Sequence, residues 1–130
     1  MMKFNAVIIA LFSSIVCIGQ LPDSTLAPNF VFNDLDGVEH ELYEYVAEGK
    51  FVFIDCFAVW CNPCWNQVPN VDASYAAFGP EGDNSTVFLA LEIAENTTDD
   101  LEHPWGVAGD WGEALEYPII NDTPGFIEDW

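Results

Sequence analysis

Basic residues are nearly absent from this chain. Lys and Arg together number 2 among 130 residues, against 22 Asp and Glu, so the net charge is −20 at pH 7. Nucleic-acid binding requires basic side chains that neutralise phosphates, and this composition argues against it. The same shortage argues against docking on an anionic membrane surface. The charge also predicts that acidic partners are repelled.

Apolar runs long enough to cross a membrane are missing as well. The run over residues 6–18 is shorter than the ~20 residues that a spanning helix needs, and it follows a single lysine. With the small residues Cys17 and Gly19 near its end, it is typical of a secretory signal peptide over residues 1–19. We expect cleavage after Gly19, export to the bacterial periplasm or the medium, and no membrane attachment afterwards. An uncleaved anchor or a lipid-modified Cys17 are the alternatives.

The remaining residues 20–130 are expected to form one domain. A chain of 130 residues suits one domain better than two. Its composition is 51% hydrophobic, with 15% aromatic residues, which is enough for a sizeable core and is unlike that of a disordered chain.

Alternating strand and helix patterns indicate an α/β fold. Strands are predicted over 30–33, 38–42, 51–57 and 86–93, helical turns over 42–46, a helix over 64–78, a short apolar segment over 117–120 and a last helix from Asp122. The Asp36-Gly37 turn predicts a hairpin between the first two strands. The nearly continuous apolar run over 51–57 predicts a central strand buried on both faces. Together with the helix and the next strand, it predicts a parallel βαβ unit.

Helical spacing supports the predicted helix, and aromatic residues mark the weaker region after the βαβ unit. The apolar residues of the helix recur at steps of three and four: Cys64, Val68, Val71, Tyr75 and Phe78. In the weakly patterned stretch 94–116, Trp105 and Trp111 are expected to pack back onto the domain.

Three cysteines remain after the expected cleavage, and two of them form a Cys-x-x-Cys pair. A zinc site needs about four ligands, and beyond Cys61 and Cys64 only Cys56, His40 and His103 are candidates, with no second ligand pair. We therefore expect no metal and no cofactor, and place both histidines on the surface or in loops. An inert structural disulfide is the alternative, although so short a loop makes it a weak staple.

The position of the pair favours disulfide exchange. Cys61 lies between the end of a buried strand and the start of a helix, where free backbone N–H groups and the helix dipole favour a thiolate. Cys64 follows one turn later and deeper, where it can resolve a mixed disulfide formed by Cys61. Pro63 between them is compatible with a first helical turn.

Asp55 is a carboxyl group inside an apolar strand, six positions before Cys61. It is either a strand-end residue that reaches solvent or a buried acid that relays a proton to or from Cys64. Cys56 points to the opposite face of the strand and is expected to be a small core residue. Trp60 either shields the sulfurs and offers a contact surface or simply packs.

Residues 55–64, Asp-Cys-Phe-Ala-Val-Trp-Cys-Asn-Pro-Cys, resemble the active-site stretch of the thioredoxin superfamily. Pro69 matches the proline that kinks the active-site helix in that superfamily. Residues 27–30 and the turn after them are similar to the exported TlpA/ResA-type, redoxin branch. The resemblance covers about residues 27–130. It implies a thioredoxin-like fold, with a βαβ unit in a central sheet and an N-terminal hairpin, and we expect the C-terminal hairpin and last helix of that fold to be missing.

The resemblance implies a thiol–disulfide oxidoreductase. Its partners would be thiols and disulfides of exported proteins and an upstream redox protein. The expected catalytic residues are Cys61, Cys64 and Asp55. The redox potential would depend on the residues between the cysteines, where Asn62 replaces the commoner glycine. One alternative is a binding or structural module of a larger secreted protein with idle or locked cysteines. A thiol peroxidase is the other, although Ala58 stands where redoxin peroxidases have Thr or Ser.

Overall fold

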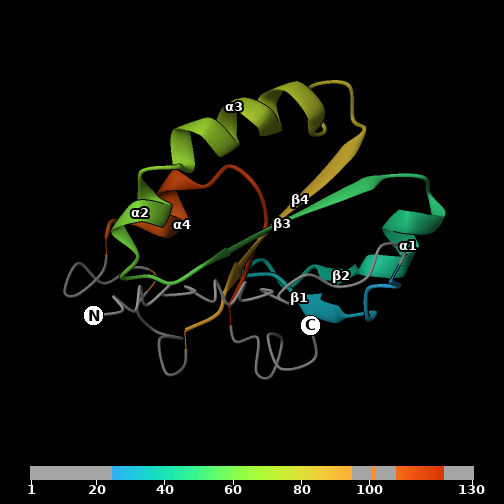
Figure 1. The fold of residues 1–130 in the computed structure, drawn as a ribbon, viewed down its shortest axis with the longest axis horizontal. Coiled ribbons are helices and arrows are strands. Elements are labelled where there is room, and N and C mark those ends of the chain that lie inside the picture. Colours follow the sequence, from blue (N-terminus) through green and yellow to red (C-terminus); the bar gives the residue numbers. More distant parts are fainter. Residues whose placement is uncertain (1–24, 95–100, 102–107, 122–130) are drawn as a thin grey trace, which may run out of the picture.

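The computed structural model describes residues 25–94, 101 and 108–121, whose strands form two small sheets (Figure 1). The predicted signal peptide, His103, Trp105 and the helix start at Asp122 lie outside these residues. The elements in chain order are β1 (Val31–Asn33), β2 (Glu39–Glu41), α1 (Leu42–Ala47), β3 (Phe51–Phe57), α2 (Asn62–Trp65), α3 (Val68–Phe78), β4 (Thr86–Glu92), α4 (Trp111–Ala114) and β5 (Ile119–Ile120). None of the helices in this part of the chain is long and apolar enough to cross a membrane.

The predicted N-terminal hairpin is confirmed, because β1 and β2 pair in antiparallel fashion. In the turn, the Asp34 carboxylate accepts hydrogen bonds from the backbone N–H groups of Asp36 and Val38, and Gly37 adopts a φ of 79° that favours glycine. His40 on β2 is buried, which corrects its predicted surface position. Its Nε2 lies 2.9 Å from Asp34 Oδ2, so a partner compensates the burial of the ring.

The βαβ unit is also confirmed. β3 and β4 run parallel, in register from Phe51 opposite Thr86 to Phe57 opposite Glu92, and α3 lies between them in sequence. β5 pairs in parallel with the other side of β4. β4 has a strand on each side, and five of its seven residues are buried.

Two apolar clusters cover the two faces of the parallel sheet. Side chains alternate along β4, so Phe88 and Ala90 belong to the cluster on the α3 side, whereas Leu89 and Leu91 belong to the cluster on the hairpin side. Figure 1 shows α2 and α3 on one side of the sheet and β1 and β2 on the other. Trp111 is buried in the first cluster, which confirms that it packs back onto the domain.

The prediction that strand 51–57 is central and buried on both faces is wrong for the described residues. β3 pairs with β4 alone among the described strands, and Phe51 and Phe53 are 74% and 42% exposed. Cys56 is exposed too, which corrects its predicted place in the core. An apolar run indicates a strand but does not show whether another element packs on each side of it. For this reason the burial predicted for strand 51–57 and for Cys56 was wrong.

The single helix predicted over 64–78 is two helices. α2 ends at Trp65, and α3 begins at Val68 with Pro69 in its first turn. Proline has no N–H to donate to the preceding turn, so the helix cannot run continuously through this position. The apolar face of α3 still contacts the core through Val68, Val71 and Tyr75, whereas Phe78 is exposed.

Candidate active site

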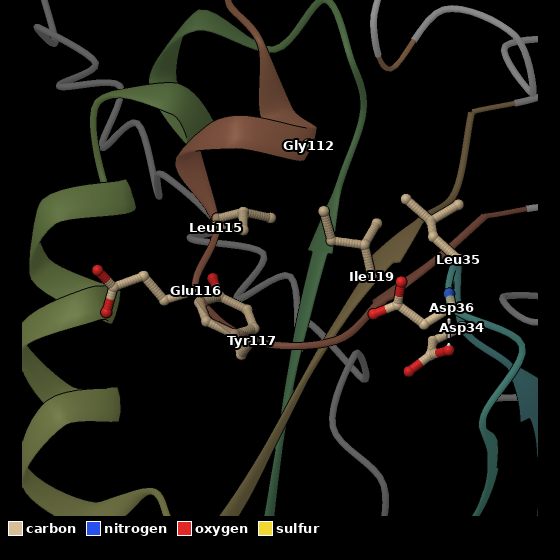
Figure 2. Close-up of a pocket in the computed structure, with 8 residues that line it drawn as sticks. All are labelled: Asp34, Leu35, Asp36, Gly112, Leu115, Glu116, Tyr117 and Ile119. Atoms are coloured by element: carbon tan, nitrogen blue, oxygen red, sulfur yellow. Dashed lines mark hydrogen bonds between the residues drawn. The ribbon is translucent and has the colours of Figure 1, made fainter. Parts of the chain in front are cut away.

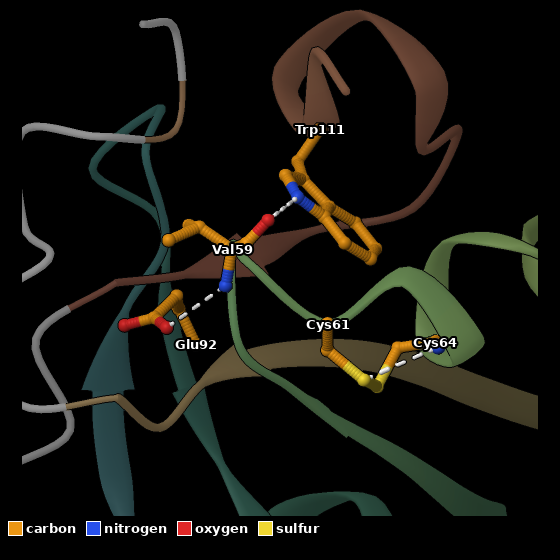
Figure 3. Close-up of a disulfide and its surroundings, with 5 residues drawn as sticks. All are labelled: Val59, Cys61, Cys64, Glu92 and Trp111. Carbon is orange, nitrogen blue, oxygen red and sulfur yellow. Dashed lines mark hydrogen bonds between the residues drawn. A yellow bond between two sulfur atoms is a disulfide. The ribbon is translucent and has the colours of Figure 1, made fainter. Parts of the chain in front are cut away.

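A short loop after the carboxyl end of β3 leads to Cys61, which forms a disulfide with Cys64 (Figure 3). Their Cα atoms are 5.3 Å apart. Cys61 is the N-cap of α2, and its Sγ accepts a hydrogen bond from the Cys64 backbone N–H at 3.2 Å. Pro63 lies in the first turn of α2, where its missing N–H leaves no intrahelical hydrogen bond unmade. The local sequence thus places the Cys61 sulfur against a backbone donor.

The electrostatic support for a Cys61 thiolate is local. Because α2 is only one turn long and separate from α3, its dipole is smaller than that of the predicted helix. The donor that contacts the sulfur is the Cys64 N–H. In addition, residues 57–71 contain no Asp, Glu, Lys, Arg or His, although the whole chain has a charge of −20. Like charges that would oppose a thiolate are therefore absent from the neighbouring sequence.

Solvent can reach the cysteine pair. Cys61 and Cys64 are partly buried, and Asn62 and Pro63 between them are exposed. Trp60 is 60% exposed, so most of its indole faces solvent rather than packing in the core. A partner protein could therefore approach the disulfide from the side of these residues.

Asp55 on β3 is partly buried and has a side-chain partner that the sequence did not indicate. The Tyr117 hydroxyl donates a hydrogen bond to Asp55 Oδ2 at 2.9 Å. Burial of Tyr117, and next the negative charge of Asp55, raise the pKa of that phenol, so it keeps its proton and remains a donor. Cys64 packs against the apolar cluster that contains Tyr117, the hydrogen-bond partner of Asp55.

A second acid near Tyr117 was also missed from the sequence. Asp72 on α3 has a buried Oδ1 with no hydrogen-bond partner among the described residues. Burial, and then the negative charge of Glu116, raise the pKa of Asp72. In the sequence it reads as an ordinary polar residue on the outer face of a helix, so nothing pointed to its burial.

A separate cavity of about 230 Å³ lies between the β1–β2 turn and the segment from α4 to β5 (Figure 2). Its lining includes Asp34, Asp36 and Glu116, and it does not include Cys61 or Cys64. No group of three or more potential metal ligands occurs among the described residues. The cavity and the cysteine pair are therefore separate features of the described structure.

Comparison with known proteins gives consistent results. The family model described as the AhpC/TSA family matches residues 24–125. The thiol-disulfide oxidoreductase ResA of Bacillus subtilis is 38% identical over 106 residues, which are 80% of this chain and 52% of that protein. ResA of Geobacillus thermodenitrificans is 36% identical over 69 residues, which are 53% of this chain and 37% of that protein. The chain thus spans about half or less of the length of these relatives.

Solved structures show the same architecture. The thioredoxin domain of a thiol-disulfide oxidoreductase from Bacteroides vulgatus aligns with a TM-score of 0.60 at 19% identity, covering 85% of this chain and 71% of that one. The predicted thioredoxin-like fold, with a parallel central sheet and an N-terminal antiparallel hairpin, is confirmed. Given that the family model matches most of its residues, the chain belongs to the AhpC/TSA family.

Proposed function

We propose that this chain is a thiol–disulfide oxidoreductase domain that exchanges disulfides with exported proteins through Cys61 and Cys64. The observation that carries the proposal is a solvent-accessible disulfide at a strand-to-helix junction, with Cys61 Sγ hydrogen-bonded to a backbone N–H. Its relatives named thiol-disulfide oxidoreductase support the same activity. Export rests on the signal peptide predicted from the sequence.

The exchange proceeds in two steps. In the reducing direction, the Cys61 thiolate attacks one sulfur of a substrate disulfide, and the other substrate sulfur leaves as a thiolate that takes up a proton. Cys64 then loses its proton and attacks Cys61 Sγ, which releases the second substrate sulfur as a thiol and forms the Cys61–Cys64 disulfide. An upstream protein dithiol reduces this disulfide again. The reverse sequence oxidises a substrate dithiol.

Asp55 is proposed to accept the proton that Cys64 loses in the second step. It lies on the strand that leads to the cysteines, and the Tyr117 hydroxyl holds its orientation. Trp60, Asn62, Pro63 and Pro69 would support the site by shaping its surface and the start of each helix.

We expect Asp55→Asn to slow the resolution of a mixed disulfide by roughly 100-fold near pH 7, the size of a general-base contribution. The difference in resolution rate between Asp55→Asn and the wild type should become smaller at high pH, where the Cys64 thiol ionises without a general base. Rapid-quench measurement of resolution from pH 6 to 10 provides the profile. Asp72→Asn, which removes a nearby acid not bonded to Tyr117, is the matched control and should change the profile little. Identical profiles for Asp55→Asn and the wild type would remove Asp55 from the mechanism.

A glutathione redox series with thiol trapping tests the proposed function itself. The proposal predicts that the Cys61–Cys64 disulfide opens and closes across this series, and that a Cys56→Ser variant behaves as the wild type does. A pair that stays closed under mild reduction would contradict the proposal and favour a structural module. Hydrogen peroxide consumption that depends on Cys61 would favour a thiol peroxidase instead.

A further inference from the structure

The backbone of Val59, two residues before Cys61, is held at both its N–H and its carbonyl by residues far away in sequence (Figure 3). The Val59 N–H donates to Glu92 Oε1 at 3.4 Å. Its carbonyl accepts from the Trp111 indole Nε1–H at 3.0 Å and from the Ala108 backbone N–H at 2.8 Å. The loop that carries Cys61 is therefore fixed by the end of β4 and the start of α4.

Trp111 also contacts the residues on both sides of the cysteine pair. Its ring stacks on Phe57, the last residue of β3, with centroids 4.3 Å apart. It meets the ring of Trp65, which directly follows Cys64, edge to face at 5.0 Å. One fully buried side chain thus joins the segment before Cys61 to the residue after Cys64.

The backbone before Trp111 approaches the same region closely. A Cβ atom added at Gly109 would lie 2.3 Å from the Trp65 ring, so only glycine permits this approach. Glu92, 2% exposed, also accepts from the Ala94 N–H at 3.0 Å, which fixes its carboxyl group at the end of β4. The contacts on Val59 therefore come from buried and well-packed groups, which can hold a loop more precisely than exposed ones.

We propose that Trp111 and Glu92 are positioning residues for disulfide exchange, which hold the backbone of Val59 so that Cys61 Sγ stays against the Cys64 N–H when the disulfide opens. The inference rests on the proposed function. In the oxidised protein the S–S bond itself keeps the two residues together. In the reduced protein that link is gone, and the hydrogen bonds on Val59 keep the Cys61 loop in the place where its thiolate has a donor.

Trp111→Phe is the direct test, because it keeps a large buried ring and removes the indole N–H. With Cys56 replaced by serine, the reduced protein is alkylated with iodoacetamide over a pH series, and mass spectrometry assigns the modified cysteine. Loss of the hydrogen bond that holds the loop should lower the Cys61 alkylation rate at pH 7 by about 3- to 10-fold, with the rates converging at high pH. The equilibrium with glutathione should shift toward the disulfide by a similar factor, because the reduced state loses stabilisation.

Controls separate positioning from general packing. Tyr75→Phe changes an aromatic residue of the same cluster, whose ring contacts Phe88 and Tyr117, and should leave both readouts unchanged. Glu92→Gln retains an oxygen that can accept from Val59 N–H, whereas Glu92→Met does not, so the glutamine variant should lie closer to the wild type. If Trp111→Phe does not fold, the alkylation rates and glutathione equilibria of Glu92→Gln and Glu92→Met still test the inference.

The outcomes distinguish this inference from the function on which it rests. A wild-type disulfide that never opens in glutathione would overturn the proposed function. A wild-type disulfide that opens normally, with folded Trp111→Phe and Glu92→Met variants that match its alkylation profile and its equilibrium, would overturn the positioning role alone.

Discussion

Cys64→Ser should convert the protein into a trap for its partners. Cys61 can still attack a disulfide in this variant, but no second sulfur lies one turn away to release the product, so a mixed disulfide accumulates. Non-reducing gels of cells that express the variant should show complexes that disappear on reduction. Mass spectrometry of these complexes identifies the partners, and an N-terminal peptide that begins at Gln20 would report cleavage of the signal peptide.

Cys61→Ser is the matched variant, and its expected defect is different. Without the attacking sulfur, no complexes form, and insulin reduction driven by dithiothreitol should fall on the order of 1000-fold or more, as when other covalent nucleophiles are removed. Cys56→Ser changes the exposed thiol on β3. It should leave insulin reduction unchanged and, combined with Cys64→Ser, should still allow the trapped complexes to form. Equal insulin reduction by Cys61→Ser and the wild type would rule out the proposed role of the pair.

Leu89→Ala should destabilise the fold strongly. Leu89 is 0% exposed in the middle of β4, between two neighbouring strands, and it packs in the cluster on the hairpin side of the sheet. Truncating a fully buried leucine costs about 2–5 kcal/mol of unfolding free energy, because apolar burial is lost and a cavity remains. Urea denaturation followed by circular dichroism measures the change.

Phe51→Ala provides the contrast for this prediction. Phe51 belongs to the adjacent strand of the same sheet but is 74% exposed, so its truncation should cost well under half of what Leu89→Ala costs. A loss for Phe51→Ala as large as that for Leu89→Ala would mean that β3 is covered in solution, and the assignment of its exposed face would be wrong.

The elements that local patterns encode could be predicted from the sequence. The Asp-Gly turn indicated the β1–β2 hairpin, and the two apolar runs around a helical repeat indicated the parallel pairing of β3 with β4. The Cys-x-x-Cys spacing likewise placed two sulfurs one turn apart. In each case the sequence pattern and the structure that it predicts involve the same short stretch of residues or one βαβ unit.

The contacts that support the site could not be predicted in this way. Tyr117 reaches Asp55 across 62 positions, and Trp111 reaches Val59 across 52. No periodicity links residues that far apart, since their contact depends on how the whole sheet brings its strands together. Burial of His40 was missed for a related reason, because its partners Asp34 and Tyr45 become apparent only after the hairpin and α1 have formed.

The border of the sheet at β3 has a consequence for how this protein behaves at high concentration. The Phe51 N–H and the Phe57 carbonyl form hydrogen bonds on the β4 side of β3. Because backbone groups alternate along a parallel strand, those of Val52, Ile54 and Cys56 face the opposite side. No described strand pairs with β3 on that side. Such a border can template the addition of strands from another molecule. Mutual repulsion between copies that each carry −20 opposes this self-association, and added salt weakens the repulsion by screening it. Concentrated samples are therefore expected to self-associate more readily as the ionic strength rises.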